Sequence, residues 1–95
     1  MRVITIPDQE NAIAILKKAN YEVLGRQQII NFMITNGLKE HTHFKDYWQE
    51  YLDYTAAYEL LKEEFKTKYI IPIVGDDSTK IWEVDFINNE VRIHD

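Results

Sequence analysis

The histidines and carboxylates of this 95-residue chain include one short cluster that could bind a metal ion. The segment Glu40-His41-Thr42-His43 places two imidazoles two residues apart, next to a carboxylate. Two histidines at this spacing can share a divalent cation, and imidazole suits zinc, nickel or copper. A structural zinc site needs four ligands, however, and the third histidine, His94, lies near the other end of the chain. We therefore expect His41 and His43 to be surface residues near a helix start, with metal binding as an alternative.

A second cluster is acidic. Asp46, Glu50 and Asp53 recur at steps of four and three residues, which places them on one face of a helix. Such a row could bind a basic region of another protein, although a solvated helix face has the same pattern. The chain has 16 acidic and 11 basic residues, a net charge of −5, so we expect no direct nucleic-acid binding. A further alternative is an inhibitor, of the kind encoded by phages or plasmids, that mimics nucleic acid toward an enzyme.

The sequence lacks the common catalytic motifs. It has no phosphate-binding loop, no G-x-S-x-G and no H-E-x-x-H. It has no cysteine, and its single serine, Ser78, lies in the predicted turn Gly75-Asp76-Asp77-Ser78. It also shows no signal peptide and no apolar run long enough for a membrane span. We expect a non-catalytic, cofactor-free, cytoplasmic protein that does not contact membranes.

Two long helices must position these clusters. Tyrosines recur at helical steps of four, three and four residues from Tyr47 to Tyr58, which predicts a helix over residues 42–68 with Thr42 as its N-cap. A preceding helix is predicted over residues 8–36, ending at the left-handed stop Asn36-Gly37. Two equally long helices joined by a short loop predict an antiparallel αα-hairpin.

A small antiparallel sheet is predicted from the two ends of the chain. Residues 1–7 contain a strand that Pro7 stops, and residues 69–95 contain an extended segment followed by a β-hairpin. Asn88-Asn89 suits a two-residue hairpin loop, because asparagine tolerates positive φ. In that register Phe86 faces Val91, and Val84 faces Ile93. The same register places Asp85 opposite Arg92 and Glu83 opposite His94. The sequence thus predicts a single α+β domain over residues 1–95.

The apolar face of each predicted helix is wider than one antiparallel neighbour can cover. Homodimerisation through the helices would cover the surplus. Tyrosine favours half-buried positions at subunit boundaries, and polar residues within a helix seam can fix the choice of partner. The residues expected at this interface are Tyr47, Trp48, Tyr51, Tyr54, Tyr58, Asn20 and Gln27.

Residues 21–93 resemble small bacterial accessory proteins associated with CXXX-repeat peptide modification loci. The resemblance rests on one group of side chains: Tyr47, Trp48, Tyr51, Trp82, Glu83, Asp85 and Phe86. The chain departs from that pattern because its last strand has no cysteine. The resemblance implies an accessory role and supplies no catalytic residues. The sequence therefore predicts an interaction or scaffold protein that self-associates and offers Asp46, Glu50 and Asp53 to a protein partner.

Overall fold

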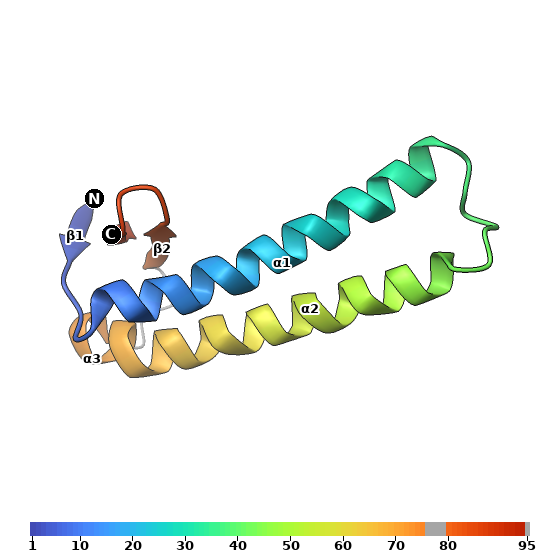
Figure 1. Ribbon diagram of the computed structural model, residues 1–95. Helices are drawn as coiled ribbons and strands as arrows, with labels where there is room; N and C mark the ends of the chain where they lie inside the picture. The colour runs from blue at the N-terminus through green and yellow to red at the C-terminus, as the bar shows by residue number, and fades with distance from the viewer. Residues whose placement is uncertain (76–79, 95) are drawn as a thin grey trace. The chain divides into compact units, whose positions relative to one another are not determined.

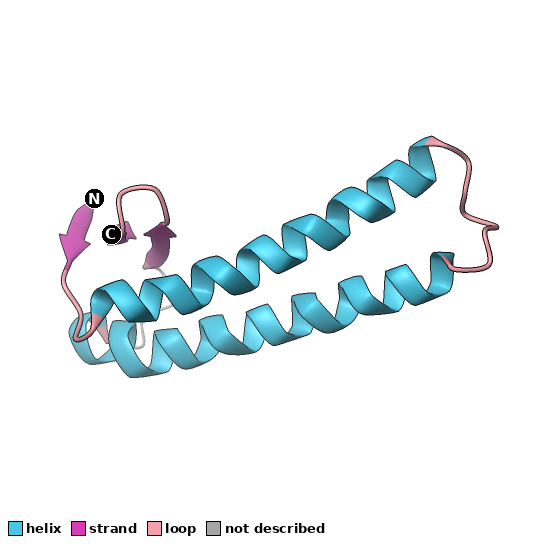
Figure 2. Ribbon diagram, in the orientation of Figure 1, coloured by secondary structure: helices cyan, strands magenta, loops and turns pink. Residues whose placement is uncertain are grey.

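The computed structural model describes residues 1–75 and 80–94. It contains two long helices and a small antiparallel sheet, so the predicted α+β class is confirmed (Figures 1 and 2). The predicted turn at residues 75–78 lies outside the described residues except for Gly75. The elements are β1 (Arg2–Ile4), α1 (Gln9–Thr35), α2 (Phe44–Phe65), the π-helix η1 (Lys66–Ile70), α3 (Ile71–Val74), β2 (Ile81–Asp85) and β3 (Glu90–His94).

The chain divides into two compact units. Unit 1 comprises residues 1–17 and 61–95, and unit 2 comprises residues 18–60. Unit 1 therefore contains the sheet, η1, α3 and one end of each long helix. Unit 2 consists of the remaining parts of α1 and α2 and the connection between them.

Helix α1 ends as the sequence predicts. Gly37 has φ of 69°, its amide bonds to the carbonyl of Ile34 at 3.2 Å, and the amide of Leu38 bonds to the carbonyl of Met33 at 2.7 Å. These two hydrogen bonds form a Schellman motif, which satisfies carbonyls that a helix end would leave unpaired. The connection is therefore specified by a single glycine.

Helix α2 begins two residues later than predicted, and Thr42 is not its N-cap. The first helical residue is Phe44, and the carbonyl of His43 accepts from the amide of Tyr47 at 3.1 Å. The preceding residues are held in turns, because the amide of Phe44 bonds to the carbonyl of His41 at 3.0 Å. These turn contacts delay the helix start.

The prediction of an extended segment from Tyr69 to Val74 is wrong. The chain continues from Phe65 into a π-helix and then into the short helix α3. Pro72 has no amide to donate to Lys68, and within an α-helix its ring would clash with that carbonyl. In η1 the amide of Ile71 instead reaches the carbonyl of Lys66, and Pro72 then occupies the first turn of α3, where proline is tolerated.

The sheet has the strand order β1-β3-β2, with β1 at one edge as predicted. The hairpin register differs from the prediction by two residues: Val84 faces Val91, and Trp82 faces Ile93. A shift of two residues keeps each side chain on its predicted face, because strand side chains alternate with a period of two. Phe86 lies in the loop and no longer faces Val91.

The hairpin loop explains this register. It spans residues 86–89, and only Asn89 has positive φ (57°), whereas the predicted two-residue loop needs positive φ at both of its central residues. The carboxylate of Asp85 accepts from the amides of Ile87 and Asn88 at 2.9 and 3.0 Å. Asp85 thus closes a longer turn that the sequence analysis did not anticipate.

The main hydrophobic core lies in unit 1. Ile13, Val91 and Ile93 are completely buried, and the rings of Phe65 and Trp82 stack with centroids 5.4 Å apart. Side chains from α1, α2 and β3 therefore share one core. Its remaining buried members are Ile4, Ile6, Ala12, Leu16 and Ile70.

Unit 2 buries much less. Among its residues, Ile30 and Met33 are the buried hydrophobic side chains. The contact between its two helical segments is reinforced by Arg26 on α1, which bonds Glu50 on α2. Unit 2 is thus an antiparallel helix pair, which agrees with the topology of the predicted αα-hairpin. Its core is sparse.

Candidate functional site

The tyrosine and tryptophan side chains of α2 in unit 2 form a continuous aromatic row, defined as Tyr47, Trp48, Tyr51, Tyr54 and Tyr58. Trp48 lies between Phe44 and Tyr51, with ring centroids 6.4 and 5.7 Å away. The exposed fractions of Tyr47, Trp48 and Tyr54 are 38%, 42% and 37%. Half-exposed aromatic side chains are typical of surfaces that contact another macromolecule.

Tyr58 is the part of the aromatic row with a perturbed hydroxyl. Burial raises its pKa, and the negative charge of Glu59 adds to the effect. Tyr58 therefore remains neutral at physiological pH and serves as a packing group.

Arg26 of α1 lies where the two helices of unit 2 meet. Its Nε donates to Glu50 Oε1 at 3.0 Å, its Nη1 contacts Glu22, and its Cζ lies 4.0 Å from the centroid of the Tyr54 ring. Partial burial opposes its charge, but the hydrogen bond to Glu50 and the charges around it outweigh burial and raise its pKa. Sequence analysis missed Arg26, although its position four residues after Glu22 is a helical ion-pair spacing.

The predicted acidic row is divided by this contact. Glu50 is half-buried and bonds to Arg26, whereas Asp46 and Asp53 are exposed. Asp46 lies 3.5 Å from His43 Nδ1, and Asp53 accepts from the Gln49 side chain at 2.9 Å. The surface carboxylates of this row are thus Asp46 and Asp53.

The histidine pair lies in the connection between the helices. The two rings are 5.5 Å apart, both residues are exposed, and His41 Nδ1 accepts from the amide of His43 at 3.2 Å. Across residues 1–75 and 80–94, no group of three or more histidine, aspartate or glutamate side chains could hold a metal ion. The structure therefore brings His41 and His43 together without further ligands.

Asn20 and Gln27 lie on α1 in unit 2. Asn20 is half-buried and Gln27 is exposed, so Gln27 takes no part in a buried seam of this unit. More of the α1 surface is apolar than the predicted interface residues suggested. Tyr21 and Phe32, which the analysis did not select, have exposed fractions of 77% and 62%.

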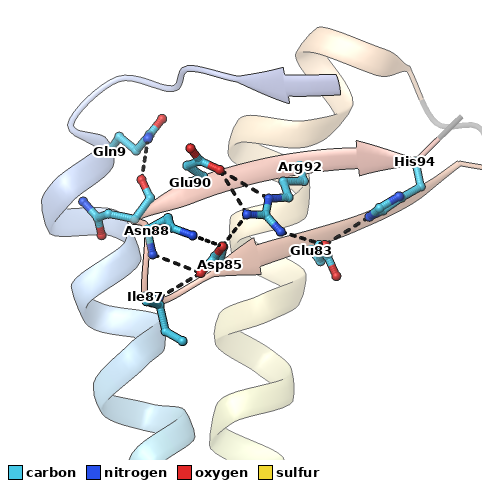
Figure 3. A network of polar contacts seen from close by, with 9 residues as sticks. Gln9, Glu83, Asp85, Ile87, Asn88, Glu90, Arg92 and His94 are labelled. Carbon is cyan, nitrogen blue, oxygen red and sulfur yellow. Dashed lines mark hydrogen bonds and ion pairs between the residues drawn. The ribbon is translucent and has the colours of Figure 1, made fainter. Parts of the chain in front are cut away.

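The polar face of the sheet in unit 1 carries a network of contacts centred on Arg92 (Figure 3). Its guanidinium contacts three carboxylates: Asp85, Glu90 at 3.2 Å and Glu83 at 3.8 Å. His94 lies 3.1 Å from the same Glu83. The predicted pairs Asp85–Arg92 and Glu83–His94 therefore form, but diagonally and not between directly opposed residues.

The hairpin loop extends this network to α1. Asp85 has a lowered pKa because the amide and the side chain of Asn88 stabilise its carboxylate and outweigh the opposing effect of burial. The amide of Ile87 and the charge of Arg92 lower the pKa further by smaller amounts. Gln9 at the start of α1 donates to the carbonyl of Asn89 at 2.9 Å (Figure 3). The Gln9 contact joins the loop to the helix. The three carboxylates share Arg92 as their partner, so we interpret the network as stabilising the hairpin.

A shallow hollow of about 160 Å³ lies beside η1 in unit 1. Its wall includes Ile15, half exposed, and Tyr69, over which the Lys68 ammonium lies 5.2 Å from the ring centroid. The sequence analysis missed this hollow because it depends on the π-helix. Its lining residues are Ala12, Ile15, Leu16, Leu61, Glu64, Phe65, Lys68 and Tyr69.

None of the helices among the described residues is long and apolar enough to cross a membrane. We compared the chain with protein-family models, curated proteins and solved structures, and none of them matched. The features of the structure that bear on function are therefore the aromatic row, the exposed apolar surface of α1 and the two surface carboxylates Asp46 and Asp53.

Proposed function

We propose that the protein is a non-catalytic interaction or scaffold protein, which self-associates through the helices of unit 2 and binds a second protein through its acidic surface. On this proposal it is an accessory protein, as its resemblance to the proteins of peptide modification loci implies. Among the described residues, no feature of similar weight favours the alternatives of metal binding or nucleic-acid mimicry.

The observation that carries the proposal is the amount of apolar surface on unit 2. Two of its hydrophobic side chains are buried, whereas ten large ones are exposed. Large contiguous apolar surfaces on soluble proteins mark interaction sites. The ten are Tyr21, Leu24, Ile29, Phe32, Ile34, Tyr47, Trp48, Leu52, Tyr54 and Leu60.

Self-association can be tested by sedimentation equilibrium from low to high micromolar concentration. We expect a concentration-dependent increase in mass toward two chains. At least one of two unit 2 variants should weaken it, either Tyr21→Ser/Phe32→Ser on α1 or Tyr47→Ser/Trp48→Ser on α2. A control variant, Ile15→Ser/Ile73→Ser, removes side chains with exposed fractions of 50% and 45% from unit 1 and should not. A mass of one chain at every concentration would reject self-association.

The acidic contact is supported by the exposure of Asp46 and Asp53 and by the net charge of −5. Oligolysine serves as a defined basic probe, and its binding is followed by amide chemical shifts in unit 2. We expect the shifts to centre on these two aspartates, to disappear with added salt and to be lost in the Asp46→Asn/Asp53→Asn variant. Equal shifts in this variant and in a Glu10→Gln/Glu63→Gln control would reject a specific acidic site.

A further inference from the structure

The surface of α1 in unit 2 carries an apolar stripe, which we name the outer face and define as Tyr21, Leu24, Gly25, Gln28 and Phe32. The steps from residue 21 through 25 and 28 to 32 are four, three and four, so these residues lie along one side of the helix. The exposed fractions of Tyr21, Leu24 and Phe32 are 77%, 45% and 62%. Two exposed aromatic side chains thus flank Gly25.

No contact among the residues that the structure describes requires a glycine at this position. Gly25 is not among the residues with positive φ, and a Cβ added to it would meet no atom within 4 Å. Glycine inside a helix is unfavourable relative to alanine, because it loses more conformational freedom on folding. A glycine does allow another backbone to approach closely. The position of Gly25 between Tyr21 and Phe32 is therefore that of a helix crossing point.

The charge distribution indicates what crosses there. Residues 19–38 contain two charged side chains, Glu22 and Arg26, which form an ion pair with each other, although the whole chain has a net charge of −5. Two copies of this chain repel each other, so they associate best where no like charges meet. A basic partner would instead favour the acidic surface at Asp46 and Asp53. The outer face, whose five residues are uncharged, therefore fits a second copy of the chain.

We propose that two copies of the protein pack α1 against α1, outer face against outer face, across a two-fold axis that passes close to Gly25. This proposal rests on the self-association proposed above and specifies its surface. In such a contact Gly25 meets its own counterpart, and residues equally far from Gly25 on either side meet each other. In an antiparallel arrangement this places Lys18 of one copy by the Phe32 ring of the other, which is a cation–π pairing.

A single introduced thiol tests the axis directly. The natural chain has no cysteine, so a Gly25→Cys variant carries one thiol. A disulfide forms where two Cα atoms lie within about 7 Å, which is met at a two-fold axis. Because a side chain at residue 25 also weakens the dimer, cross-linking is measured at a protein concentration above the dissociation constant of the Gly25→Ala dimer. There we expect the Gly25→Cys variant to form disulfide-linked dimers faster than a Leu60→Cys control, by roughly tenfold or more, because bound copies hold the two thiols at high effective concentration.

Two further variants separate association from folding. Gly25→Ala should raise the thermal stability of the monomer and yet weaken the dimer, because its methyl group separates the helices. Phe32→Gln should raise the dimer dissociation constant by roughly tenfold or more. Leu60→Gln is the matched control, because Leu60 is 61% exposed against 62% for Phe32 and lies on α2. It should leave the dissociation constant unchanged.

The outcomes distinguish this proposal from the more general one. If the natural protein is monomeric at every concentration, both are wrong. If it dimerises, but Gly25→Cys cross-links no faster than Leu60→Cys and Gly25→Ala dimerises normally, then self-association stands and the Gly25 axis is wrong. Loss of dimerisation in Tyr47→Ser/Trp48→Ser alone would move the contact to the aromatic row and would likewise overturn the axis.

Discussion

Unit 1 and unit 2 both contain many hydrophobic side chains but bury them to different extents. Among the described residues, nine hydrophobic side chains are buried in unit 1, but only Ile30 and Met33 are buried in unit 2. Unit 1 has a sheet, two helix ends and η1 to enclose its core, whereas a pair of helices leaves most of each circumference in solvent. We infer that burial in unit 1 supplies most of the stability of the fold, whereas the apolar side chains of unit 2 are exposed and available to contact another chain.

Truncation of matched core residues should show the largest effect. Ile13 (0% exposed) and Ile30 (4% exposed) lie on the same helix in different units. We expect Ile13→Ala to lower the free energy of unfolding by about 3–5 kcal/mol, and Ile30→Ala by nearer 2 kcal/mol, because a cavity in an open helix pair collapses more readily. Urea denaturation at low protein concentration measures both. Equal losses would contradict the difference between the units.

The two arginine clusters offer a second comparison. Arg92 in unit 1 and Arg26 in unit 2 each have 25% of the side chain exposed, and each contacts more than one carboxylate. Replacing either with glutamine leaves those carboxylates facing each other. We expect Arg92→Gln to lower the free energy of unfolding by about 1–2 kcal/mol and Arg26→Gln to lower it by less, because Arg92 contacts three carboxylates and Arg26 two.

Salt provides the control for these arginine variants. Screening weakens repulsion between the abandoned carboxylates, so both losses should decrease at high ionic strength. Losses that do not change with salt would show that the arginines act through packing of their side chains.

Residues in the left-handed conformation should give effects of similar size in the two units. Asn89 ends the hairpin loop of unit 1 with φ of 57°, and Gly37 ends α1 in unit 2 with φ of 69°. Alanine at either position is expected to cost about 1–2 kcal/mol, because Cβ approaches the following carbonyl in this conformation. Asn89→Gly is the control and should be tolerated. Thermal unfolding checks these values, and a neutral Gly37→Ala would show that the helix stop is dispensable.

The smallest effect concerns pH and lies in unit 1. The pKa of Asp85 is lowered from its ordinary value of 3.8, first through its hydrogen bonds to Asn88. A carboxyl whose pKa is lower in the folded state stabilises the fold fully above its unfolded pKa, and this stabilisation is lost as pH falls through the folded pKa. The stability advantage of the natural protein over Asp85→Asn should therefore shrink below about pH 4.

A titration of the Asp85 carboxyl by NMR measures the pKa itself. An unshifted pKa, or an Asp85→Asn variant whose relative stability stays constant from neutral to acidic pH, would contradict this account.

Much of the candidate site followed from local sequence patterns. The helical spacing of Tyr47, Trp48 and Tyr51 placed the aromatic row on one helix, and Tyr47 and Trp48 of that row have exposed fractions of 38% and 42%. Their role at an interface stays a prediction. Arg26 did not follow, because its partner Glu50 lies 24 residues away in the sequence. The exposure of Tyr21 and Phe32 also depended on which side of α1 faces α2.

Local sequence patterns were sufficient to predict the two long helices and the strands of the hairpin. Periodicity defined both long helices, Gly37 ended the first, and alternation set the inner and outer faces of the hairpin. Tertiary structure decided the rest. A two-residue shift of register leaves every strand side chain on the same face, so alternation cannot exclude it, and the hydrogen bonds of Asp85 select the loop. The division of buried residues between the units likewise depends on contacts between distant segments, which no local pattern encodes.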